Sequence, residues 1–179
     1  ESDKVTDRVM DSNDIEKERG ITILAKNTGI VYKDHQINIV DTPGHADFGG
    51  EVERTLQMVE GFLLLVDAAE GVLPGTRFVL QKALALNLKP IVFINKIDRK
   101  DADPKRTEEL IHDLFLDLAT EDGHLDFPIL YGSGKLGFAT TDPEKPTDSM
   151  KPILDAILKT IPAAIPINKS STKVTAKVR

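Results

Sequence analysis

One stretch of the sequence, Asp41-Thr42-Pro43-Gly44-His45, places an acid, a tight turn and a histidine directly behind the apolar run Ile37 to Val40. A strand that ends in this way presents a carboxylate and backbone N–H groups at the carboxyl edge of a sheet, where α/β folds bind ligands. Asp41 suits the water shell of a magnesium ion, and the N–H of Gly44 suits a terminal phosphate. His45 would then stand where an attacking water has to be held.

A second polar segment, Asn95-Lys96-Ile97-Asp98, follows the apolar run Ile91 to Ile94. The carboxylate of Asp98 can accept hydrogen bonds from both the ring N–H and the exocyclic amine of guanine, a pair of donors that adenine lacks. Asn95 would join neighbouring loops and meet the edge of the base, while the aliphatic part of Lys96 would lie along the ring. The plain alternative is a polar turn with a solvated lysine.

A third segment, Gly132-Ser133-Gly134-Lys135, invites comparison with a phosphate-binding loop. The motif Gly-x-x-x-x-Gly-Lys-Ser/Thr needs a glycine where Ile129 stands and a hydroxyl where Leu136 stands, so the spacing does not fit. The segment fits better as a loop that closes over the carbonyl of guanine through backbone N–H groups. We therefore place Ser133, Gly134 and Lys135 with the base-binding residues.

A fourth segment, Arg19-Gly20-Ile21-Thr22-Ile23, puts a threonine between β-branched neighbours after a glycine hinge. Taken alone, Thr22 reads as an ordinary strand residue.

The elements that must carry these segments alternate between strand and helix. Apolar runs predict a hairpin of 30–32 with 37–40 and buried strands over 62–66, 91–94 and 127–131. Helical spacing predicts helices over 48–59, 74–86, 104–118 and 150–161. Gly61 would stop the first of these helices, and Asp103 would be the N-cap of the third. In the second, Val79, Ala83 and Leu86 would face the core. This order predicts an α/β fold with a mostly parallel sheet and helices on both faces.

The chain divides in two by composition. We predict one domain over 1–162 and a linker or tail over 163–179, where Pro162 to Pro166 is linker-like and 168–179 holds four positive charges and no acid. That end should be disordered or poorly packed, although the alternation of Val174, Ala176 and Val178 is also consistent with the start of a strand.

Charge and cysteine content narrow the classes of function. A net charge of -6 argues against an overall electrostatic surface for nucleic acid, so we expect no direct DNA binding. With no cysteine, the chain has no disulfide, thiolate ligand or thiol nucleophile. No apolar run approaches the roughly 18 residues of a membrane span, so we expect no membrane partner and a soluble, cytoplasmic protein.

Taken in order, the four polar segments resemble the GTP-binding domain of translational GTPases, of elongation-factor type. The chain from about Val9 to Pro162 is similar to that domain. It looks most like the BipA/TypA ribosome-associated branch in three stretches, Ile23 to Asn27, Phe48 to Arg54 and Leu125 to Pro128. Elongation factor G is similar but usually lacks the Gly49-Gly50 pair after the phenylalanine.

The resemblance implies a P-loop NTPase-like fold, GTP/GDP and Mg²⁺ as cofactors, and the ribosome as partner. In this family Thr22 and Asp41 would ligate magnesium, directly and through water, and Gly44 would sense the terminal phosphate. His45 would position the attacking water, making it the catalytic residue. Hydrolysis to GDP and phosphate would release the segments around Thr22 and Asp41, as a conformational switch.

The sequence departs from the family before Thr22, where neither the phosphate loop nor the central first strand of the sheet is present. Strands on both sides of that position would lose a neighbour. We therefore predict the GTP-binding domain of a ribosome-associated GTPase as an incomplete piece. Two alternatives are a non-catalytic fragment or pseudo-GTPase module with the same fold, and the GTPase domain of a protein like elongation factor G.

Overall fold

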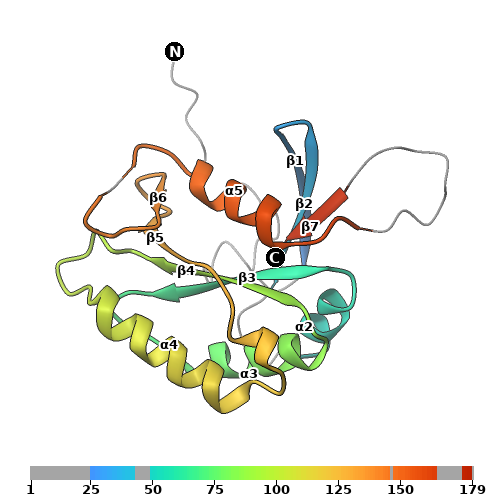
Figure 1. Ribbon diagram of the computed structural model, residues 1–179, viewed down its shortest axis with the longest axis horizontal. Coiled ribbons are helices and arrows are strands. Elements are labelled where there is room, and N and C mark those ends of the chain that lie inside the picture. The colour runs from blue at the N-terminus through green and yellow to red at the C-terminus, as the bar shows by residue number, and fades with distance from the viewer. Residues whose placement is uncertain (1–24, 43–48, 146, 165–174, 179) are drawn as a thin grey trace, which may run out of the picture.

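The computed structural model describes residues 25–42, 49–145, 147–164 and 175–178, the last as backbone (Figure 1). The elements alternate as the sequence predicts. In chain order they are β1 (Lys26–Tyr32), β2 (His35–Asp41), α2 (Gly49–Leu56), β3 (Gly61–Asp67), α3 (Pro74–Ala85), β4 (Lys89–Asn95), α4 (Pro104–Leu118), the 3-10 helix η2 (Asp122–His124), β5 (Ile129–Ser133), β6 (Phe138–Thr140), α5 (Lys151–Thr160) and β7 (Thr175–Val178).

The strands form two sheets, in the orders β1-β2-β7 and β3-β4-β5-β6. The pairs β3–β4, β4–β5 and β2–β7 are parallel, and the pairs β1–β2 and β5–β6 are antiparallel. The predicted α/β class with mostly parallel pairing is therefore confirmed, but the strands divide between a sheet of three and a sheet of four.

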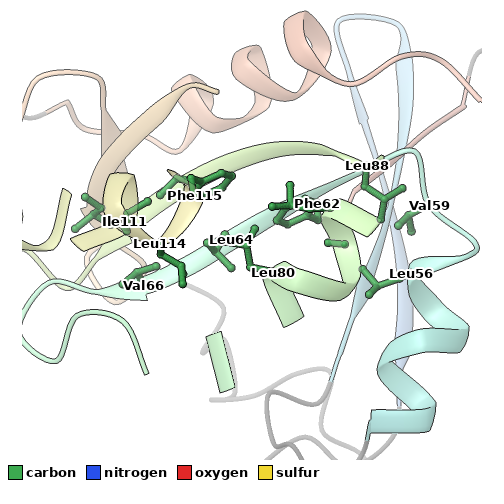
Figure 2. Close-up of a cluster of buried hydrophobic side chains, with 14 of the residues drawn as sticks. Leu56, Val59, Phe62, Leu64, Val66, Leu80, Leu88, Ile111, Leu114 and Phe115 are labelled. Atoms are coloured by element: carbon green, nitrogen blue, oxygen red, sulfur yellow. The ribbon is translucent and has the colours of Figure 1, made fainter. Parts of the chain in front are cut away.

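Helices cover both faces of the sheet that contains β4. Alternate side chains of β4 point to opposite faces. Val92 and Ile94 belong to a buried cluster with α2, α3 and α4, and Figure 2 shows Phe62, Leu80 and Phe115 within it. On the other face Ile91 and Phe93 pack against residues of α5, which lies on the side opposite α3 and α4 in Figure 1.

The sheet of four is less evenly covered at β3 than the sequence predicts. Its run Phe62 to Val66 was expected to be buried on both faces, but 58% of Leu65 is exposed. On that face α5 contacts mainly β4 and β6. β3 therefore carries an exposed leucine close to the predicted ligand edge.

Two helix predictions needed correction. α2 ends at Leu56, so Gly61 does not stop the helix but begins β3. In α3 the buried residues are Leu80, Ala83 and Leu84, while Leu86 lies past the helix end and is exposed. The buried face of α3 therefore shares Ala83 with the predicted face, and Leu80 and Leu84 take the places of Val79 and Leu86. Asp103 does cap α4, because its Oδ1 accepts from the N–H of Arg106 at 3.0 Å.

The hairpin of β1 and β2 is confirmed and has a tighter turn than expected. Tyr32 pairs with His35, and the connecting Lys33 and Asp34 both have positive φ, 46° and 62°. This is the backbone of a type I′ turn, whose twist suits two paired strands. His35 is exposed and begins β2.

Two short strands complete the sheets. β6 was not predicted from the sequence, because its three residues are too few for a pattern. β7 lies in the predicted linker or tail, pairs with β2 from Gln36 to Ile39, and also contacts β3. The alternative of a strand near the chain end is thus the one found. The prediction that the strand ending in Asp41 would lose a neighbour is wrong, because β7 pairs with it.

Among the described residues, no helix combines the length and apolar character needed to cross a membrane.

Candidate functional site

Three parallel strands of one sheet end in polar residues at the same edge. Asp67 ends β3 and pairs in register with Asn95, which ends β4, while Ser133 ends the neighbouring β5. Because parallel strands share their carboxyl edge, these residues and the loops that follow them meet there. The sequence predicted site residues at three strand ends, Asp41, Asn95 and Ser133. Asn95 and Ser133 do meet at this edge, together with Asp67, whereas Asp41 ends β2 in the sheet of three.

Asn95 joins the loops that follow β4 and β5. Its Oδ1 accepts hydrogen bonds from the N–H of Lys96 and from the N–H of Gly134, both at 2.9 Å. The backbone adds a second link, in which the N–H of Ile97 donates to the carbonyl of Gly132 at 3.2 Å. The predicted joining of loops by Asn95 is present, whereas its contact with a base stays a prediction.

Lys96 is held at both ends. Its backbone has φ 63°, in the left-handed region, and its Nζ lies 2.7 Å from Oδ2 of Asp67. The Nη1 of Arg99 lies 3.4 Å from the same oxygen. Arg99 also donates two hydrogen bonds to the carboxylate of Asp101, from Nε at 2.8 Å and from Nη2 at 2.6 Å. A carboxylate therefore faces two cations beside the base-binding segment.

The pKa of Asp67 reflects opposing effects. Burial raises it, while the hydrogen bond from Lys96 and those from the N–H groups of Ala69 and Glu70 lower it, and the net pKa is below the usual value. Asp67 is thus ionised in the folded chain at neutral pH.

The other predicted base-binding residues lie close to these loops. Asp98 and Lys135 are exposed, and Gly134 lies beside Asn95. Ser133 is fully buried, and its Oγ accepts from the N–H of Leu136 at 3.2 Å. The hydroxyl of Ser133 therefore stabilises the turn of its own loop.

Two adjoining hollows lie along β3. A cavity of about 220 Å³ at the ligand edge is lined by Asp67, Asn95 and Lys96, together with Leu65, Val66, Gly71, Leu73 and Thr76. A cavity of about 250 Å³ shares Leu65 and Thr76 with it and reaches Asp41 and Thr42 at the end of β2. The predicted magnesium ligand Asp41 thus borders a hollow that adjoins the base-binding segment.

Three predicted site residues, Thr22, Gly44 and His45, lie outside the described residues. Sequence reasoning also missed Asp67 and Arg99 as neighbours of Lys96. The available signal was the position of Asp67 at the end of an apolar run, which Asp41 and Asn95 share.

A larger hollow of about 810 Å³ lies elsewhere, near the start of β4 and β5. Its lining includes Phe127, Pro128, Pro152 and Ala156, with the charged residues Lys89, Asp126, Asp155 and Lys159. None of the predicted site residues lines it.

Comparison with known proteins decides the family. The profile of the elongation factor Tu GTP-binding domain matches residues 1–163. The chain belongs to this family. The predicted resemblance to the GTP-binding domain of translational GTPases is therefore confirmed.

The curated relatives place this member of the family near one branch. The chain is 53% identical over 164 residues to the large ribosomal subunit assembly factor BipA of Bacillus subtilis, an alignment that covers 92% of the chain and 27% of that protein. It is 59% identical over 155 residues to BipA of Haemophilus influenzae, covering 87% of the chain and 25% of that protein. The chain thus spans about a quarter of the length of these relatives.

A solved structure shares the fold. The translation elongation factor SelB of Methanococcus maripaludis, in complex with the GTP analogue GppNHp, matches with a TM-score of 0.65 and 26% sequence identity. The match covers 84% of this chain and 31% of that chain.

Proposed function

We propose that this chain is the guanine-nucleotide-binding part of a BipA-like GTPase, which hydrolyses GTP to GDP and phosphate as a switch on the ribosome. The observation that carries the proposal is the bond from Gly134 N–H to Asn95 Oδ1, which brings the predicted base-binding loops together. This arrangement suits a purine whose edge meets Asp98 and whose carbonyl meets the loop after β5. The relatives support the ribosome as partner, since they are named large ribosomal subunit assembly factors.

Asp98 and Lys96 would divide the recognition of the base. Asp98 is exposed at the loop after β4, where its carboxylate is available to the two N–H donors of guanine. The half-exposed side chain of Lys96 would supply an aliphatic surface along the ring. Ser133, Gly134 and Lys135 would close the other side of the base.

Asp41 and Thr22 would hold Mg²⁺, and the residues present fit this ion. Asp41 is an exposed carboxylate at the end of β2, and carboxylate and hydroxyl oxygens are ligands that magnesium accepts. When bound, the ion would neutralise charge on the phosphates. Gly44 would contact the terminal phosphate, and His45 would hold the attacking water.

A second candidate function is a base-binding module without hydrolysis. It is favoured by one observation, that the hydrogen bond from Gly134 N–H to Asn95 Oδ1 assembles the base-binding loops within the described residues. Charged hydrogen bonds to phosphate contribute about 1.5 to 3 kcal/mol each, so several of them amount to roughly 5 to 10 kcal/mol. Without them, a nanomolar site would weaken to roughly micromolar or millimolar affinity.

The experiment is a titration of this chain with fluorescent GDP and Mg²⁺, with ADP as the competitor control. We expect saturable binding in the micromolar to millimolar range that unlabelled GDP displaces and ADP does not. Equal displacement by ADP, or no saturation at millimolar GDP, would remove the proposed function from this polypeptide. Phosphate release from GTP, measured in parallel samples of the chain with Mg²⁺, separates the two candidates, because only the GTPase hydrolyses GTP.

A further inference from the structure

We infer that Asp67 is a positioning residue for the nucleotide base, which it serves by holding the ammonium of Lys96 so that the aliphatic stem lies ready along the ring. The inference rests on the proposed function and extends it by a residue outside the predicted site. It is carried by the Nζ to Oδ2 distance of 2.7 Å and by the fixed surroundings of the carboxylate.

The carboxylate of Asp67 is itself immobilised. Its Oδ1 accepts from the N–H of Ala69 at 2.8 Å and from the N–H of Glu70 at 3.3 Å. The N–H of Gly71 donates to the carbonyl of Asp67 at 2.8 Å, so the turn after β3 is closed around it. With only 11% of its side chain exposed, Asp67 is a fixed point to which the lysine must adjust.

Lys96 is thereby fixed at its two ends. Asn95 accepts its backbone N–H, Asp67 accepts its ammonium, and the stem between them borders the hollow of about 220 Å³. A lysine loses much rotamer freedom when it is ordered. If the ion pair already orders the stem in the free chain, less conformational entropy is lost when the nucleotide binds.

The two oxygens of Asp67 have separable tasks. Oδ1 holds the turn, and Oδ2 faces Lys96 and, more distantly, Arg99. An Asp67→Asn variant keeps a carbonyl oxygen for the N–H groups of Ala69 and Glu70, and loses the negative charge that holds the ammonium. A role confined to the turn therefore predicts little effect of this substitution.

The first test measures Kd for GDP and for inosine diphosphate, whose base lacks the exocyclic amine. Asp67→Asn should raise both values about fivefold to tenfold and leave their ratio unchanged, because the stem contacts the ring whatever the base carries. In a Lys96→Met background the substitution should have no further effect. The matched control is Asp101→Asn, which removes a charge that contacts Arg99 in the same loop and should leave Kd unchanged.

Three results of this test would overturn the inference. The first is an unchanged Kd in Asp67→Asn. The second is a changed ratio of the Kd values for GDP and inosine diphosphate, and the third is an equal loss of affinity in the Lys96→Met background. Either of the last two would mean that the whole loop has shifted.

A second test needs no nucleotide. Brief labelling with acetic anhydride, quantified by mass spectrometry, should modify Lys96 several times faster in Asp67→Asn than in the wild type, with exposed Lys100 as internal reference. An unchanged rate would overturn the inference and leave the proposed function standing. If Lys96 is labelled faster but the chain binds no GDP, the proposed function is overturned. The role of Asp67 in base binding would then be overturned as well.

Discussion

At the scale of single residues, the site depends on side chains that serve more than one loop. Asn95 accepts N–H groups from the loop after β4 and from the loop after β5, so it fixes the distance between them. Asp98, by contrast, is exposed and has its surface turned to solvent. Substitution of Asn95 should therefore change the stability of the fold, and substitution of Asp98 should change the choice of ligand.

Asp98→Asn should shift the preference of the chain from guanine toward xanthine nucleotides. Xanthine carries a carbonyl where guanine has its exocyclic amine, and an asparagine amide can donate to that oxygen where a carboxylate cannot. Competition of GDP and xanthosine diphosphate against a fluorescent nucleotide measures the change. A variant that keeps its preference for guanine would exclude Asp98 from base recognition.

Asn95→Ala should lower the free energy of unfolding by about 1 to 3 kcal/mol, because two backbone N–H groups of the site lose their acceptor. Urea unfolding followed by circular dichroism measures the loss. Asn95→Asp is the control, since it keeps an acceptor oxygen at the same place and should lose less. Equal losses in the two variants would mean that these bonds contribute little.

The pKa of Asp67 predicts part of the acid sensitivity of the fold. The pKa of Asp67 is lower in the folded chain than in the unfolded chain, where it is about 4. Such a group stabilises the fold at pH values above its unfolded pKa. This stabilisation is lost as the pH falls through the folded pKa. Unfolding free energies measured from pH 5 downward should fall less steeply for Asp67→Asn than for the wild type. Parallel curves would contradict this contribution.

At the scale of elements, the packing of β3 against its neighbours explains a glycine that the sequence assigned to a helix end. A Cβ on Gly61 would lie 2.7 Å from Cγ1 of Ile161 and 2.8 Å from the carbonyl of Lys89. The start of β3 therefore passes too close to the end of α5 and to β4 for any larger residue.

Gly61→Ala should lower the free energy of unfolding by about 1 to 3 kcal/mol, because β3 or the chain after α5 must move to make room. Gly50→Ala is the matched control. Among the described residues, no atom outside the helix's own backbone lies within 4 Å of its added Cβ. Because alanine favours helix α2, the variant should be neutral or stabilising by up to about 1 kcal/mol. Thermal unfolding of both variants tests the contrast, and a neutral Gly61→Ala would show that the contact is easily relieved.

The same elements show how far sequence patterns reach. α4 was predictable because Asp103-Pro104 and the apolar positions Ile111, Leu114 and Phe115 describe its start and its buried face locally. The pairing of Asp67 with Lys96 was not, because it depends on the register of β3 against β4. The buried hydroxyl of Ser133 likewise depends on the return of the chain into β6, which no local pattern indicated.

At the scale of the whole molecule, the two sheets meet beside β3, the strand that carries exposed Leu65. β7 contacts β3 without a ladder between them, and the cavity of about 250 Å³ separates the end of β2 from Leu63 to Leu65. Exposed Leu65 and Leu73 lie near this border. An exposed apolar strand edge favours association between copies of a chain.

Leu65→Lys should reduce self-association without lowering stability by more than about 0.5 kcal/mol, because 58% of Leu65 is exposed. Sedimentation velocity over a range of concentrations measures the association. Leu64→Lys is the contrasting control, since Leu64 is buried and the lysine should unfold the chain. Unchanged sedimentation of soluble Leu65→Lys would place any association at another surface.

The pairing of β5 with β6 would limit how a nucleotide held at the proposed site could leave. Ser133 pairs with Phe138, and β6 is tied on its far side because the N–H of Ala139 donates to the carbonyl of Ser149 at 3.0 Å. The loop from Gly134 to Gly137 is thus a hairpin tip with both ends anchored. It cannot swing aside as a lid unless the strands separate. If the proposed function holds, a nucleotide would therefore leave from the phosphate side of the site. The amide of Gly134 should exchange slowly with deuterium whether or not GDP is added.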